Sequence, residues 1–131
     1  MKRLLWILGG ATLVVACGSS PDVPSLPATV ILAPGESARA ESVRVTFVKV
    51  TSDSRCPINA ICASAGEATA IFNVTAHGIE SSPELGVVDP AKRITVVGGI
   101  VVEFDDLQPF PFAGQPTDPK NYRARVKISE R

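Results

Sequence analysis

The stretch Tyr122-Arg123-Ala124-Arg125-Val126-Lys127-Ile128 alternates apolar and basic residues with a period of two. In a β-strand, successive side chains point to opposite faces of the sheet. Tyr122, Ala124, Val126 and Ile128 would therefore face a core, while the basic residues between them face water. This pattern predicts a half-buried β-strand near the end of the chain.

The same two-residue period recurs upstream, and a helical period of 3.6 is never sustained. Strands are predicted at residues 29–32, 43–50, 66–76, 85–88, 94–97, 100–107 and 122–128. Two consecutive apolar residues, Phe47-Val48, interrupt the second of these and predict a bulge or a strand buried on both faces. His77-Gly78 and Gly98-Gly99 are predicted to be turns, the latter within a hairpin.

About seven short strands at roughly ten-residue spacing, with no convincing helix, are typical of a two-layer fold of antiparallel sheets. We therefore predict an all-β fold, an antiparallel β-sandwich of immunoglobulin-like size. A small β-barrel is the alternative. The chain of 131 residues is long enough for one such domain. Equal numbers of basic and acidic residues, 13 of each, argue against nucleic acid as a partner.

The N-terminus has the features of an export signal. Lys2 and Arg3 precede an apolar run that is too short to anchor the chain across a bilayer. The run ends in Val14-Val15-Ala16-Cys17, which resembles the lipobox of bacterial lipoproteins. The resemblance implies that residues 1–16 are a signal peptide, removed by cleavage before Cys17, and that the Cys17 sulfur carries a diacylglycerol. The alternative is an ordinary secretory signal in which Cys17 is incidental.

Residues 17–27 are rich in Gly, Ser and Pro, which is typical of an extended tether, and residues 28–131 would form the folded domain. Two or more fatty chains would hold such a protein on a membrane stably. The expected location is the bacterial cell envelope, with the domain outside the cytoplasm. By the sorting rule for lipoproteins, Gly18 after the acylated cysteine favours the outer membrane where the cell has one.

Cys56 and Cys62 are both expected in one loop of an exported domain, so a disulfide is the first interpretation. A structural zinc site needs four ligands, and two thiols with the single histidine, His77, do not supply them. The spacing also differs from the Cys-x-x-Cys of redox motifs. We predict no metal and no cofactor.

The segment Asp53-Ser54-Arg55-Cys56-Pro57, with Cys62 and Gly66-Glu67-Ala68 behind it, resembles a motif of an uncharacterised family of small bacterial lipoproteins and secreted β-proteins. Members commonly carry an aromatic residue between the second cysteine and the glycine, where this chain has Ser64. The stretch 107–111 also resembles a turn that closes the penultimate strand in such proteins. The resemblance supports the disulfide and the sandwich and implies no established activity.

No catalytic set is recognisable. His77 lies in a predicted turn, where a solvated residue is the simplest interpretation. Acidic residues at positions 103, 105 and 106, with Asp53 and Asp89 in loops, leave open a carboxylate pair for hydrolysis or a calcium site. A solvated acidic face is the other interpretation, with Asp53 and Arg55 bracing the cysteine loop.

Two loops are candidate contact surfaces for a protein partner. Phe110 and Phe112 lie in a proline-stiffened loop, and the alternative is that both rings cap the core. Arg55, Ile58 and Ile61 belong to the loop closed by the cysteines. The first functional hypothesis is a non-enzymatic, lipid-anchored binding module in the envelope. The second is an exported protease inhibitor that inserts one of these loops as a wedge, and the third is an enzyme of unfamiliar type.

Overall fold

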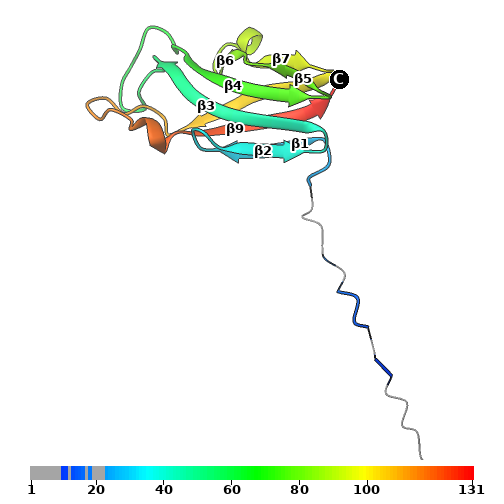
Figure 1. Cartoon of the computed structure of the whole chain (residues 1–131). Helices are drawn as coiled ribbons and strands as arrows, with labels where there is room; N and C mark the ends of the chain where they lie inside the picture. The colour runs from blue at the N-terminus through cyan, green and yellow to red at the C-terminus, as the bar shows by residue number, and fades with distance from the viewer. Residues whose placement is uncertain (1–9, 12, 17, 19–22) are drawn as a thin grey trace, which may run out of the picture.

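Two antiparallel β-sheets pack face to face in the computed structural model, which describes residues 10–11, 13–16, 18 and 23–131 (Figure 1). The strands are β1 (Ala28–Leu32), β2 (Ser37–Ala40), β3 (Val43–Asp53), β4 (Ala68–Ala76), β5 (Ile79–Ser81), β6 (Glu84–Gly86), β7 (Ile94–Val97), β8 (Ile100–Gln108) and β9 (Arg123–Glu130). Two short 3₁₀ helices, η1 (Pro90–Lys92) and η2 (Pro119–Asn121), interrupt the connections.

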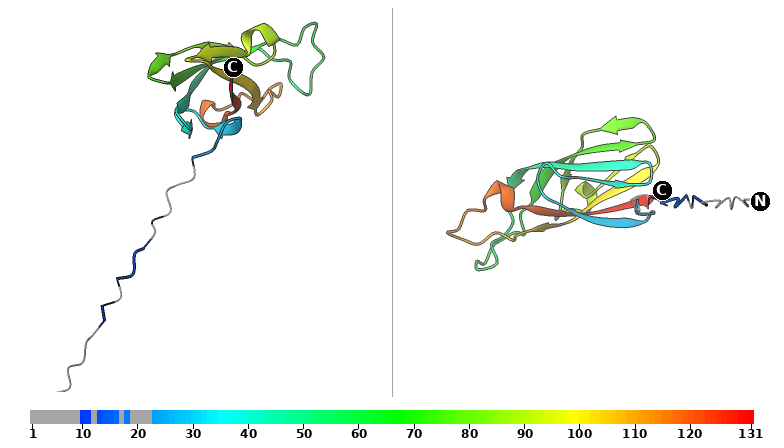
Figure 2. Two further views of the ribbon diagram at one scale, coloured as in Figure 1. Left: turned by 90° about the vertical axis from the view of Figure 1, so that its right-hand side faces the viewer. Right: turned by 60° about the horizontal axis from the view of Figure 1, so that its bottom comes forward.

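One sheet has the strand order β1-β9-β8-β7, and the other has the order β2-β3-β4-β5 with β6 also paired to β4. The sheets are not closed into a barrel. The prediction of an all-β sandwich is therefore confirmed, and the barrel alternative is wrong. Figure 2 shows the two layers from two further directions.

The core lies between the sheets and follows the alternation in the sequence. Ala124, Val126 and Ile128 of β9 are fully buried, and Tyr122 just before the strand is 7% exposed. In the middle of the core, the Phe72 ring lies 5.5 Å from that of Phe47 and 5.0 Å from that of Phe104, between ring centroids. In the part of the chain that the structure describes, the buried core side chains all belong to residues 32–128, so the sandwich has a core of its own.

The predicted turns and bulge are confirmed. His77 and Gly78 both have positive φ, 49° and 77°, as a tight hairpin between β4 and β5 requires. Gly98 and Gly99, at 56° and 76°, make the corresponding turn between β7 and β8. The register of β3 against β4 shifts after Phe47, where the apolar pair interrupts the alternation.

The described residues form nine strands rather than the seven or so that were predicted. The two that the sequence pattern missed are β2 and β5, which have four and three residues and lie at the edge of their sheet. The strand predicted at residues 85–88 is instead Glu84–Gly86. It ends there because the backbone N–H groups of Val88 and Asp89 donate to the Glu67 carboxylate rather than to a neighbouring strand.

The two ends of the sandwich differ. The connection from β3 to β4 and the connection from β8 to β9 lie together at one end, whereas the segment before β1 and the C-terminus lie at the other (Figure 1). Among the described residues, no helix has the length and apolar character needed to cross a membrane. Cys17 and most of residues 1–16 lie outside the described residues.

Candidate functional site

Arg55 joins the two loops at the end of the sandwich opposite the segment that precedes β1. Its guanidinium forms a two-pronged ion pair with Asp53, with both N···O distances 2.8 Å. It also donates to the backbone carbonyls of Leu107, at 2.6 Å, and Pro109, at 3.0 Å. Arg55 is 6% exposed. A buried arginine whose three side-chain nitrogens all donate to partners acts as a cross-link between segments.

Asp53 is held in its ionised form by the same contacts. Burial alone would raise the pKa of the Asp53 carboxyl, but the hydrogen bonds and charge of Arg55, with the hydrogen bond from Tyr122, hold it below its ordinary value. The Tyr122 hydroxyl donates to Asp53 at 3.0 Å. Burial and the adjacent Asp53 carboxylate raise the pKa of the Tyr122 phenol. At neutral pH the Asp53 carboxyl is therefore ionised and the Tyr122 phenol is protonated.

The loop between the cysteines docks on the loop that follows β8. Cys56 and Cys62 form the disulfide expected from the sequence, with a Cα–Cα distance of 5.9 Å. Within the closed loop, the Ile58 N–H donates to the Pro111 carbonyl at 3.0 Å. The Asn59 side-chain oxygen accepts from the Ala113 N–H at 2.8 Å. Because each loop supplies one donor and one acceptor, the two form a single unit.

Gly66 allows the cysteine loop to return to β4. Its φ of +69° belongs to the left-handed region that favours glycine. A Cβ at this position would lie 1.8 Å from the carbonyl oxygen of Ser54, so a side chain does not fit there. The close approach lets the Ser54 N–H donate to the Glu67 carbonyl at 2.7 Å and closes the base of the loop.

Glu67 fixes the segment after β6 to the same base. Its carboxylate accepts four backbone N–H groups at 2.7 to 2.9 Å, from Ala68, Val87, Val88 and Asp89. Burial alone would raise the pKa of Glu67, but these four donors outweigh it and lower the pKa. Arg55 and Glu67 thus hold backbone segments in place on either side of the cysteine loop.

Four apolar side chains project from the two docked loops into solvent, and we call them the loop tip. Ile58 is 69% exposed and Ile61 is fully exposed, while Phe110 and Phe112 are 47% and 42% exposed. Apart from the buried Arg55, neither residues 54–66 nor residues 108–117 include a charged residue. Large apolar groups exposed on an uncharged surface, here two loops joined by hydrogen bonds, are a mark of interaction sites.

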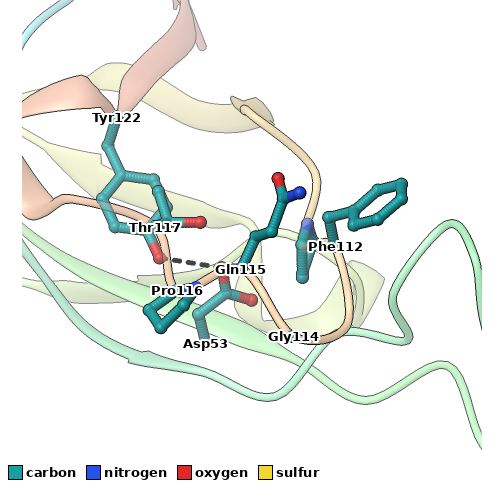
Figure 3. A pocket seen from close by; sticks show the side chains of 8 residues that line it. Asp53, Phe112, Gly114, Gln115, Pro116, Thr117 and Tyr122 are labelled. Atoms are coloured by element: carbon teal, nitrogen blue, oxygen red, sulfur yellow. Dashed lines mark hydrogen bonds between the residues drawn. The ribbon is translucent and has the colours of Figure 1, made fainter.

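A pocket of about 390 Å³ opens beside the loop tip (Figure 3). The hydrogen-bonded pair of Tyr122 and Asp53 lies on one side and the Phe112 ring on the other, with the Gln115 amide between them. Pro116 and Thr117 complete the wall. The Asp53 carboxylate is the charged group in this wall, and it is paired with Arg55.

The structure changes the role of one candidate contact residue. Arg55 was expected to contribute to a contact surface, but its buried guanidinium is used within the protein, so we remove it from that surface. The Arg55 Cζ atom lies over the Phe110 ring, 5.2 Å from its centroid, in a cation–π contact. Asp53 and Arg55 do brace the cysteine loop, as the solvated-face interpretation supposed. Ile58, Ile61, Phe110 and Phe112 are brought together at one end.

The other candidate catalytic and metal-binding side chains lie apart from one another. His77 is exposed in its turn, with the Ser42 hydroxyl 3.3 Å from Nδ1. Asp105 is paired with Arg125 and Lys127 across β8 and β9. In the part of the chain that the structure describes, no three His, Cys, Asp or Glu side chains gather closely enough to hold a metal ion. Sequence reasoning missed the roles of Tyr122, Asn59 and Glu67, because their partners are mostly backbone groups distant in sequence.

Comparisons of the chain with protein-family models, with curated proteins and with solved structures found no match. The resemblance of residues 53–68 to a family of small lipoproteins and secreted β-proteins stays a prediction. So does the resemblance of residues 14–17 to a lipobox.

Proposed function

We propose that this protein is a lipid-anchored bacterial envelope protein that acts as a non-enzymatic binding module and contacts a protein partner through the loop tip. The supporting observation is the tip itself: four large apolar side chains are exposed on two loops that Arg55 joins to each other, and one of these loops is closed by a disulfide. Because the loops are already ordered, binding would cost little conformational entropy. Exposed aromatic and branched side chains in such a frame are typical energetic centres of interfaces.

The arrangement of the ends supports an anchored module. Residues 23–27 leave the sandwich at the end opposite the loop tip (Figure 1). An acyl chain on Cys17 would hold that end near the bilayer, and the ten residues from 18 to 27 allow a separation of up to about 35 Å. The loop tip would then face away from the membrane, toward other envelope proteins.

The anchor is tested by Cys17→Ser. We expect the variant to lose incorporation of an alkyne fatty acid in metabolic labelling and to be left unprocessed or unanchored, because the acceptor thiol is gone. Labelling of the Ser variant at the level of the wild type would contradict the lipoprotein assignment.

The loop tip is tested by the double variant Phe110→Ala/Phe112→Ala. Since both rings are about half exposed, we expect it to lose no more than about 1 to 2 kcal/mol of unfolding free energy, measured by urea denaturation. The same variant should lose capture of the partner from envelope extract, whereas Ile31→Ala, which removes an exposed side chain from β1, should retain it. A loss of about 3 to 5 kcal/mol would instead show that the rings belong to the core.

A protease inhibitor is the second candidate. The observation in its favour is the disulfide-closed loop of residues 56–62, which presents Ile61 fully exposed on a fixed backbone. A rigid projecting loop suits insertion into an active-site cleft. Residues 18–131 titrated against a panel of secreted and envelope proteases would show stoichiometric inhibition that Ile61→Asp abolishes. Unchanged protease activity across the panel would leave the binding module as the better account.

A further inference from the structure

Two arginines face each other on the exposed side of the second sheet. Arg39 of β2 and Arg44 of β3 are directly paired in the strand register, and both are exposed. Like charges opposite one another across strands destabilise a sheet. Within the described residues, neither guanidinium forms a salt bridge. Residues that break a local rule without internal compensation are candidates for binding.

The arginine pair lines a hollow of about 410 Å³ that also contains two carboxylates. The register continues from Arg44 to Thr75 and from Thr75 to Glu80, so these residues form one row across β2, β3, β4 and β5. Glu41, in the turn between β2 and β3, lines the same hollow. Glu80 therefore lies across the hollow from the arginines, whereas Glu41 lies beside them.

The spacing of this row suits a ligand with two opposite charges. Two strand spacings, about 10 Å, separate the backbones of Arg44 and Glu80, with the uncharged Thr75 between them. A phosphate would lie against the arginines, whose planar groups favour phosphate oxygens. An ammonium group one short linker away would lie toward Glu80.

The hollow lies next to the N-terminal segment. The Leu26 N–H donates to Glu41 Oε1 at 3.3 Å, so the chain that leads toward Cys17 passes the rim of the hollow. If Cys17 is acylated, this is the part of the sandwich held nearest to lipid headgroups. The inference that the phosphate belongs to a lipid rests on the proposed anchor. The inference that the hollow binds a phosphate and an ammonium group does not depend on the anchor.

We propose that Arg39, Arg44, Glu41 and Glu80 form a binding site for a phosphoethanolamine headgroup of the membrane that holds the protein. The site takes a phosphate diester on the arginines and a primary ammonium on Glu80, with Glu41 lining the hollow beside the arginines. Binding of individual headgroups is weak, but the anchor raises their effective concentration and sets the orientation of the sandwich on the bilayer.

The test uses unacylated, ¹⁵N-labelled residues 18–131, which contain the complete core. Titration with glycerophosphoethanolamine should shift the Arg39 and Arg44 Nε resonances and the Thr75 amide. Glycerophosphoglycerol has the same phosphate without the ammonium and should bind at least about tenfold more weakly. Arg44→Gln should weaken binding by at least about tenfold, since it removes a charged hydrogen-bonding partner. Lys49→Gln, the same change of charge on β3 outside the hollow, should have no effect.

A second experiment, with lipid vesicles, tests whether the phosphate that binds belongs to a lipid. Vesicles containing half phosphatidylethanolamine in phosphatidylcholine should retain more of the domain than phosphatidylcholine alone, and Arg44→Gln should remove the difference. Binding of the soluble diester without vesicle retention would overturn the lipid source. Equal binding of the two diesters would overturn the ammonium subsite, and no shift with either would overturn the site. Because the protein is unacylated, none of these results depends on Cys17.

Discussion

At the scale of single residues, Arg55 organises the loop end of the molecule. Its guanidinium contacts Asp53 on its own segment and two carbonyls more than 50 residues away, at Leu107 and Pro109. A buried charge is tolerated only where the fold supplies hydrogen-bonding partners of opposite charge or polarity. For Arg55 these partners are the Asp53 carboxylate and the two carbonyls. The sequence suggested a bracing role for Asp53 and Arg55. Backbone carbonyls leave no signal in a sequence, so the docking of the second loop was not predictable.

Arg55→Ala is expected to destabilise the fold by about 3 to 5 kcal/mol, because it leaves the buried Asp53 carboxylate without its counter-ion. The free energy of unfolding in urea measures this. Arg125→Ala is the control, since that arginine pairs with Asp105 on the exposed face and such pairs contribute about 1 kcal/mol or less. Equal losses from the two variants would contradict the cross-linking role of Arg55.

Acid should weaken the fold through Asp53 and Glu67, whose pKa values are both lower in the folded protein than in the unfolded chain. The stability that they contribute is complete above their ordinary pKa values, 3.8 and 4.5, and is lost as the pH falls through the lower folded values. The free energy of unfolding should therefore decrease as the pH is lowered below about 4.5.

Glu67→Gln tests this account of the acid response. An amide has one acceptor oxygen for four backbone donors, so we expect a loss of about 1 to 3 kcal/mol at neutral pH. The variant should also show a flatter dependence of stability on pH between about 5 and about 3. Urea denaturation across this range gives both quantities. An unchanged acid slope would mean that Glu67 contributes nothing to it.

At the scale of elements, alternation made seven strands predictable from the chain, together with their turns. The strand β2, Ser37-Ala38-Arg39-Ala40, has no β-branched or aromatic residue, and β5 has only three residues. Both are held by their neighbours rather than by their own preference for extended backbone. The cysteine loop was recognised by its residues, but its contact with the loop after β8 depends on tertiary structure.

The close approach of Gly66 to Ser54, where the cysteine loop leads back into β4, is tested by Gly66→Ala. We expect a loss of several kcal/mol, because a Cβ at this position meets the Ser54 carbonyl. Gly114→Ala is the matched control, since Gly114 has a similar positive φ of +82° but nothing within 4 Å of the added atom. It should cost about 1 to 2 kcal/mol for its backbone conformation alone. Similar losses would show that the close approach at Gly66 has no effect.

The disulfide is expected to stabilise the loop without determining the fold. Cys62→Ala should lower the melting temperature, because the free energy of unfolding falls by about 2 kcal/mol. The far-ultraviolet β-sheet signal should stay unchanged. The intact mass before and after reduction and alkylation shows directly whether the two thiols are joined. Two free thiols in native, unreduced protein would contradict the bridge.

At the scale of the whole molecule, the two ends have different characters. One end has the N-terminal segment, the arginine pair and two carboxylates, and the other has an uncharged surface of apolar side chains. Such an arrangement suits a protein that is held at one end and binds at the other. The sequence predicted the individual tip residues but not their gathering, which results from the sheet topology that brings two distant connections to one end.

The most direct test of a binding surface at the loop tip is photocrosslinking in living cells. A photoreactive amino acid is placed at Ile61 and, in a second strain, at Ile31, an isoleucine that is 64% exposed on β1. After illumination, the Ile61 protein should form a discrete crosslinked species with another protein, and the Ile31 protein should not. No adduct at Ile61, or the same adducts at both positions, would contradict the account.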